Sequence, residues 1–187
     1  MFRRKNTKGE KRIIMALITL ENTLTTKAVF SPDKKHRYLL SKRWSDKEDN
    51  IAAIIMVNPA TAADIVLDKT SMLIINHLQE LGFTGCDIVN IYSCIASSTK
   101  DENKSNPIND KQIVSSAKDA TKVILGWGSA GENNKRIADR QKEVLKLLKP
   151  FKDKLVTIAD SKGRSGYHPL APQIYAKWVL KPFEEKS

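Results

Sequence analysis

The chain has little cysteine: Cys86 and Cys94 are the only two among its 187 residues. Two thiols are too few for a disulfide framework or for a zinc site with four cysteine ligands. Both are most simply explained as reduced thiols packed in a core, which favours a cytoplasmic location. The sequence therefore predicts neither a metal site nor a cofactor.

Long hydrophobic runs are missing as well. No stretch reaches the length of about 18 apolar residues that a membrane-spanning helix needs, so we expect no membrane association. The shorter run from Ile13 to Leu20 has no small-residue cleavage site and is more typical of a strand than of a signal peptide. The sequence also shows no internal repeat and no low-complexity linker, and residues 1–187 are expected to form a single domain.

Acidic side chains are outnumbered by basic ones: 32 Lys and Arg stand against 21 Asp and Glu, which gives a net charge of +11. Such an excess favours polyanionic partners such as nucleic acid. Part of it lies in residues 1–12, where six basic side chains accompany one acid. We expect a flexible arm there, which either contacts phosphates or only aids solubility.

Hydrophobic patterning predicts an α/β domain. Residues 25–30 and 37–44 are strand-like and flank a turn, as in a β-hairpin. Continuous apolar runs then alternate with helical patterns, as expected of parallel strands buried on both faces. The later strands are expected at residues 51–57, 87–91, 122–125 and 155–159, and the helices at 70–81, 111–120, 132–148 and 172–180. We predict a three-layer α/β/α sandwich with a short central parallel sheet, preceded by an N-terminal β-hairpin.

Polar loops follow the four later strands. In parallel sheets wrapped by helices, ligands bind beyond the carboxyl ends of the strands, so these loops are where a site is expected. The catalytic candidates in them are Asn58, Asp64 and His168. The substrate-binding candidates are Pro59, Thr61, Asn90, Tyr92, Trp127, Gly128 and Lys162.

The first loop allows two interpretations. The amide of Asn58 both donates and accepts hydrogen bonds, so it can orient a water or bind a polar edge. Asn58-Pro59 also suits a plain turn, and the repetition of polar loops at four strand ends is what favours a site. One of the carboxylates that follow, Asp64 or Asp68, is expected to cap the next helix. Asp64 is preferred for the site because it lies nearer to Asn58.

His168 lies in a loop with the cations Lys162 and Arg164. Neighbouring positive charge disfavours the imidazolium, so we expect a neutral ring that donates a hydrogen bond or acts as a general acid. The alternative is a surface histidine without a role. Of the other two histidines, His77 is expected to be structural and His36 to be solvated.

The glycines in Gly126-Trp127-Gly128-Ser129-Ala130-Gly131 have the spacing of a dinucleotide-binding loop, between a strand and a helix. The acid that binds the ribose should end the next strand, whereas Glu143 falls inside the predicted helix. This disfavours a dinucleotide site. Exposed N–H groups in such a loop would still suit a phosphate.

Several motifs follow one another between about Val29 and Leu170: RYLLSKRW, IIMVNPATAAD, DKTS, DIVNIY, LGWGSAG and HPL. In this order they resemble an uncharacterised family of bacterial and phage proteins, domain of unknown function 1643. The resemblance implies the same α/β domain and supplies no activity.

A more distant similarity is to the uracil-DNA glycosylase superfamily, which also has a short parallel sheet with its site at the strand ends. The features that match are Asn58-Pro59, Asn90, Leu125-Gly126 with Ala130, and His168-Pro169. This resemblance implies that Asn58 positions the hydrolytic water, Asn90 reads the base edge and His168 hydrogen-bonds the leaving base.

The chain departs from that superfamily at Met56-Val57, where a glycine is usual, and at Leu170, where a serine is usual. The leading hypothesis is a nucleic-acid- or nucleotide-directed protein that acts as a base-excising hydrolase. Two alternatives stay open. One is a non-catalytic nucleic-acid-binding accessory protein, and the other is a small-molecule or nucleotide enzyme that uses the glycine loop for phosphate.

Overall fold

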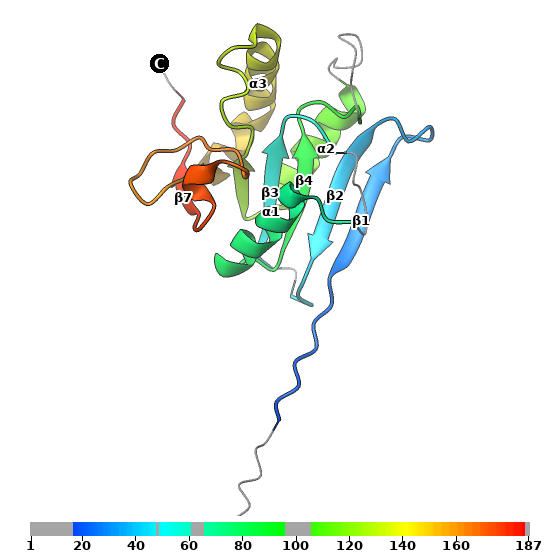
Figure 1. Ribbon diagram of the computed structural model, residues 1–187. Coiled ribbons are helices and arrows are strands. Elements are labelled where there is room, and N and C mark those ends of the chain that lie inside the picture. Colours follow the sequence, from blue (N-terminus) through cyan, green and yellow to red (C-terminus); the bar gives the residue numbers. More distant parts are fainter. Residues whose placement is uncertain (1–16, 48, 61–65, 96–105, 186–187) are drawn as a thin grey trace, which may run out of the picture.

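The computed structural model describes residues 17–47, 49–60, 66–95 and 106–185. Within these ranges one seven-stranded sheet runs in the order β1-β2-β4-β3-β5-β6-β7 (Figure 1). The strands are β1 (Thr25–Phe30), β2 (Arg37–Arg43), β3 (Ile51–Met56), β4 (Gly85–Asn90), β5 (Lys122–Leu125), β6 (Leu155–Ala159) and β7 (Val179–Pro182). The predicted α/β class is confirmed.

The sheet is mixed and not wholly parallel. Its centre, β4-β3-β5-β6, is parallel, and these strands are the apolar runs that the sequence pattern predicted. The N-terminal strands β1 and β2 pair antiparallel, and β2 then pairs antiparallel with β4. The first two strands therefore extend the same sheet on one side, and β7 extends it on the other by pairing antiparallel with β6.

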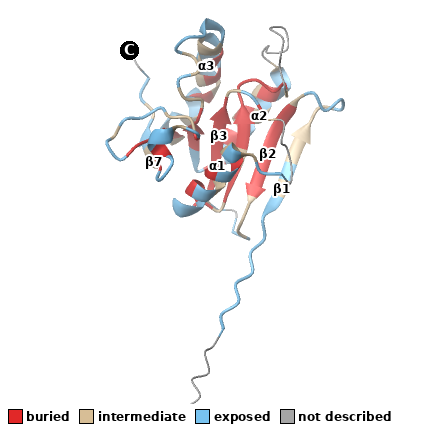
Figure 2. Cartoon of the chain, in the orientation of Figure 1, coloured by how far each residue is buried: buried red, intermediate tan, exposed pale blue. Residues whose placement is uncertain are grey.

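Helices cover both faces of the sheet. The helix α1 (Lys69–Glu80) packs its apolar residues with Ile54 of β3 in one core cluster. The helices α2 (Pro107–Asp119) and α3 (Lys135–Leu148) pack on the opposite face with Ile55 of β3 in a second cluster. Since β3 contributes alternate residues to both clusters, all six of its residues are buried (Figure 2).

Each α-helix begins at a side chain that accepts from the backbone of its first turn, which satisfies N–H groups that would otherwise lack a partner. Asp68 caps α1 by accepting from the Ser71 amide at 2.7 Å. Asn106 and Asn134 cap α2 and α3 in the same way. Of the two carboxylates considered for a cap, Asp68 therefore takes that role.

Two sequence expectations about secondary structure are wrong. Residues 172–180 do not form a helix: a 3₁₀ turn, Pro172–Ile174, is followed by β7. Trp178, which is buried, stacks on His77 of α1 with the ring centroids 4.8 Å apart, and this contact carries the chain back toward the sheet. Residues 17–20 form no strand, and the rest of that apolar run, like the basic residues 1–12, lies outside the described residues.

The described ranges contain no helix that combines the length and the apolar character needed to cross a membrane.

Candidate functional site

The four parallel strands deliver their following loops to one edge of the sheet. Met56 at the end of β3 is in register with Asn90 at the end of β4. On the other side of β3, the register joins Ile55 to Leu125, and Leu125 to Thr157 of β6. The polar residues that leave these strands therefore start from neighbouring positions, as the sequence pattern predicted.

The first loop begins with Asn58, two residues beyond the end of β3. Its side chain is exposed, whereas Pro59 is buried and anchors the loop to the domain. An exposed amide on an anchored backbone can meet a ligand without a large loss of conformational freedom. Thr61 and Asp64, the other candidates of this loop, lie outside the described residues.

Asn90 ends β4 and is only 2% exposed. Strand alternation directs it to the α1 face, with Cys86 and Ile88 of the same strand. Its backbone carbonyl accepts from the Asn109 side chain at 2.8 Å. Asn90 therefore places a buried side-chain amide at the end of β4, next to the start of the first loop.

The segment after β4 is held by buried polar groups of α2 and α3. Arg140 is 4% exposed, and its Nε donates to the Ile91 carbonyl at 3.1 Å. The guanidinium also binds the carboxylates of Asp110 and Glu143. A charged group buried among such partners fixes the backbone that it contacts, so this network positions the exit of β4.

Tyr92 and Trp127 lie on the other face of the sheet. Tyr92 is 2% exposed within the α2–α3 core cluster, and its hydroxyl donates to the Arg136 carbonyl at 3.2 Å. Trp127 is half-buried against the same cluster. These rings are thus separated from Asn90 by the sheet, and packing accounts for both.

The glycine loop lies against the histidine loop. Gly128 has a φ of +60°, and a Cβ built on it would lie 2.8 Å from the Cβ of His168. A side chain at this position would therefore displace His168, so the absence of one permits the contact. The loop does not open a helix directly, because α3 begins at Lys135 and is capped by Asn134. This weakens the comparison with a dinucleotide-binding loop.

His168 is half-buried, and its Nδ1 accepts from the Leu170 amide at 3.1 Å. Burial lowers the pKa of His168 below its ordinary value of 6.5. The ring is therefore neutral at pH 7, and because Nδ1 is an acceptor, the proton is on Nε2. Burial, and not the neighbouring positive charge that the sequence suggested, is the cause of the lowered pKa.

Asp160 organises the loop that leads to His168. Its carboxylate accepts from the amides of Lys162 and Arg164 at 2.9 and 3.0 Å, and from the Tyr167 hydroxyl at 3.2 Å. Arg164 Nε also donates to it at 2.8 Å. Burial acts to raise the pKa of Asp160, but these hydrogen bonds outweigh it and hold the pKa below 3.8. Lys162 is exposed on the turn so formed.

Arg37 is a site neighbour that sequence reasoning missed. It is 3% exposed, and its Nη1 donates to the Ala60 carbonyl of the first loop at 3.4 Å. Burial lowers the pKa of Arg37, and the nearby Asp68 carboxylate opposes that effect. Because β2 runs antiparallel to β4, its first residue lies where β4 ends. Only the pairing of β2 with β4 brings this cation to the site.

A separate groove of about 470 Å³ opens between β1, β2 and α2. The ion pair of Arg43 with Asp87, at 2.8 Å, lies in its lining, and Ser116 donates to the same carboxylate at 3.3 Å. No residue predicted to form the site lines this groove. The strand-end edge and the groove are therefore distinct places on the domain.

An exposed amide, a buried amide and a half-buried imidazole thus follow the ends of strands in the same parallel sheet. Amides can orient water or bind a polar ring edge, and an imidazole N–H can stabilise charge on a leaving group. A family model described as "Protein of unknown function (DUF1643)" matches residues 37–170. No curated protein and no solved structure matches the chain.

Proposed function

Because the chain belongs to the DUF1643 family of proteins of unknown function, we propose a function from the site itself. The protein is a cytoplasmic hydrolase that excises bases from nucleic acid at the carboxyl edge of strands β3 to β6. The proposal includes kinship of its fold with the uracil-DNA glycosylase superfamily, inferred from the order of the site motifs.

One observation carries the proposal: the Cβ and backbone of His168 lie against Gly128, and its Nδ1 accepts from the Leu170 amide, which leaves the proton of the neutral ring on Nε2. Excision breaks the bond between the sugar C1′ and the base nitrogen, and the base leaves with the bonding electrons. A neutral N–H donor stabilises that developing charge without a prior proton transfer. Such a donor is useful only if it is rigidly placed, and the hydrogen bonds of Asp160 hold the loop in place.

The two asparagines supply the remaining roles. Asn58 orients the water whose oxygen adds to C1′, and Asp64 accepts the proton that this water loses. Asn90 reads the edge of the flipped base with its side-chain amide, which carries both a donor and an acceptor. Pro59 and Thr61 contact the substrate, and the base enters on the α1 side of the sheet.

The net charge of +11 supports a nucleic-acid substrate. Basic side chains neutralise phosphates and release counterions, so binding must weaken as salt rises. Lys162, exposed on the turn before His168, contacts the backbone beside the extruded base.

The proposal is tested by single-turnover incubation with single- and double-stranded oligonucleotides that carry modified bases, followed by alkaline cleavage at abasic sites. The wild type is expected to release at least one base. Asn58→Ala and His168→Ala are each expected to lower that rate by about 100-fold or more, while the affinity for the oligonucleotide stays within about threefold. Lys142→Ala, an exposed change on α3, is the matched control and should leave the rate unchanged.

If no oligonucleotide loses a base while salt-dependent binding persists unchanged in Asn58→Ala and His168→Ala, the hydrolase proposal is wrong. That result would favour a non-catalytic nucleic-acid-binding protein instead.

A further inference from the structure

The segment before β1 exposes an unusual number of large apolar side chains. Leu17, Ile18 and Leu20 are 91%, 85% and 82% exposed, and Leu24 is 43% exposed. The segment has no secondary structure and leads away from the domain, as Figure 1 shows. Four large apolar groups within eight residues, all accessible to water, point to a partner that covers them.

The same segment has the pattern of a strand. From Ile18 to Leu24, apolar residues and Asn22 occupy the even positions, and Thr19, Glu21 and Thr23 occupy the odd positions. This alternation continues into β1, where Ala28 packs against the α1-side core and Lys27 faces the other side, in the lining of the groove. Residues 18–28 thus read as one long strand, of which the domain pairs only the last part.

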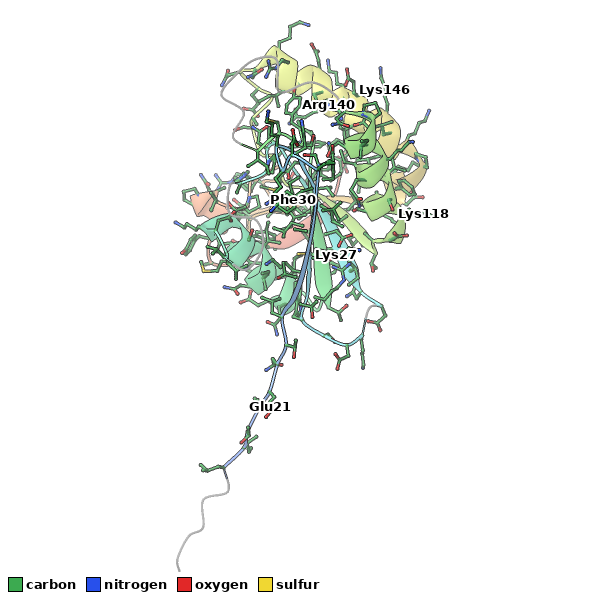
Figure 3. All side chains as sticks on the ribbon, turned by 90° about the vertical axis from the view of Figure 1, so that its right-hand side faces the viewer. Glu21, Lys27, Phe30, Lys118, Arg140 and Lys146 are labelled. Atoms are coloured by element: carbon green, nitrogen blue, oxygen red, sulfur yellow. The ribbon has the colours of Figure 1, made fainter. Side chains whose placement is uncertain are left out.

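The strand β1 also has an open edge. It ends the sheet, and among the described strands only β2 pairs with it. An open edge presents a row of backbone donors and acceptors that another strand can pair with. The open edge and the strand-like segment are continuous along the chain (Figure 3).

We propose that residues 17–24 pair antiparallel with the open edge of β1 in a second copy of this chain, so that two sheets join across a two-fold axis. This goes beyond the proposed function and does not depend on it. The register that fits the side chains places Leu20 opposite Ala28, Glu21 opposite Lys27, and Leu24 opposite Leu24 of the second copy.

This register satisfies both faces of the new ladder. Leu20 and Leu24 lie on the side where Ala28 already packs into the core, so apolar groups meet apolar groups. Glu21 meets Lys27 on the other side, and the two-fold axis makes that pair occur twice. The pairing by opposite charges also offsets repulsion between copies that each carry +11. Figure 3 labels Glu21 on the segment and Lys27 on β1.

A single cysteine tests the two-fold axis. Residues that face each other in an antiparallel pair have Cα atoms about 4.5 or 5.5 Å apart, within the reach of a disulfide. Leu24→Cys in the full chain should therefore give a covalent dimer under mild oxidation, seen on a non-reducing gel. Leu17→Cys is the matched control. Residue 17 is more exposed than residue 24 but does not face its own copy across the axis, so this variant should run mainly as an uncross-linked monomer on the same gel.

Charge reversal tests the register. Glu21→Lys and Lys27→Glu each place like charges together twice, and each should weaken dimerisation by about tenfold in sedimentation equilibrium. The double variant restores the pair and should recover the wild-type dissociation constant. Glu184→Lys, an exposed change near the other end of the sheet, is the control for net charge.

Three results would overturn the proposal. They are a monomer at every concentration, equal cross-linking of Leu17→Cys and Leu24→Cys, and a double charge variant that dimerises no better than the two single variants. Dimerisation of the wild type with recovery in the double variant would support it, whatever the catalytic assay shows.

Discussion

The centre and the β1 end of the sheet differ in what covers them. Every residue of β3 is buried because helices lie over both its faces, whereas each residue of β1 is exposed or half-buried (Figure 2). The centre therefore gives a rigid base from which polar loops project, and the β1 end leaves an open edge. One sheet can thus carry two different surfaces, one of projecting loops and one of unpaired strand edge.

Truncating one side chain in the centre of the sheet and one in β1 should give the largest difference in the free energy of unfolding. Ile54→Ala removes a fully buried side chain from β3 and is expected to lower the free energy of unfolding by about 2–5 kcal/mol. Val29→Ala in β1 removes a half-buried side chain and should cost about 1 kcal/mol or less. Urea unfolding of the two variants measures this. Equal losses would contradict the distinction between a covered centre and an open edge.

The exit of β4 depends on a buried cation. Arg140→Ala removes the donor to the Ile91 carbonyl and leaves Asp110 without its partner, so the free energy of unfolding should fall by about 2 kcal/mol. Because the Asn90 carbonyl lies beside this network, the amide signals of Asn90 should also shift in an NMR spectrum of Arg140→Ala. Lys142→Ala on the exposed face of the same helix is the control. If Arg140→Ala lowered the free energy of unfolding no more than this control does, Arg140 would not position the exit of β4.

Alanine substitutions at two glycines test the contact between the loop that contains Gly128 and the loop that contains His168. Gly128 and Gly166 both have positive φ, of +60° and +88°, so alanine at either should cost about 1–2 kcal/mol of backbone strain. Only at Gly128 would the new Cβ meet His168, since nothing lies within 4 Å at Gly166. The His168 ring signals should therefore move in Gly128→Ala and stay in place in Gly166→Ala. Identical spectra would argue against the contact.

The smallest expected effect is on pH dependence. Since burial lowers the pKa of His168 in the folded state, its contribution to stability is complete above pH 6.5 and is lost as the pH falls through the folded pKa. The wild type should thus lose slightly more stability than His168→Gln between pH 6.5 and 5. NMR titration of the ring gives the folded pKa directly, and a midpoint above 6.5 would contradict the burial argument.

Continuous apolar runs made the centre of the sheet predictable. The strand at residues 155–159 and the strand at 122–125 match β6 and β5, because short β-branched runs between helices leave few alternatives. The terminal helix was predicted wrongly because Ile174 and Trp178 have helical spacing, yet both are buried as the chain returns to pair with β6. Local periodicity does not record such tertiary pairing.

The site was only partly predictable for the same reason. Order along the chain indicated the loops that contain Asn58, Asn90 and His168, since parallel strands end at one edge. It did not indicate which face each residue takes, so Tyr92 and Trp127 were grouped with residues from which the sheet separates them. Arg37 was missed because its place depends on an antiparallel pairing that a local pattern cannot encode.

Nucleic acid is proposed to bind at the carboxyl edge of the parallel strands. Titrating the labelled protein with a short single-stranded oligonucleotide in ¹H–¹⁵N correlation spectra tests this residue by residue. We expect the largest shifts at the side-chain amides of Asn58 and Asn90 and at the backbone amides of Gly128 and His168, with β1 unchanged. Shifts confined to β1 and its neighbours, with the strand ends unmoved, would contradict the claim.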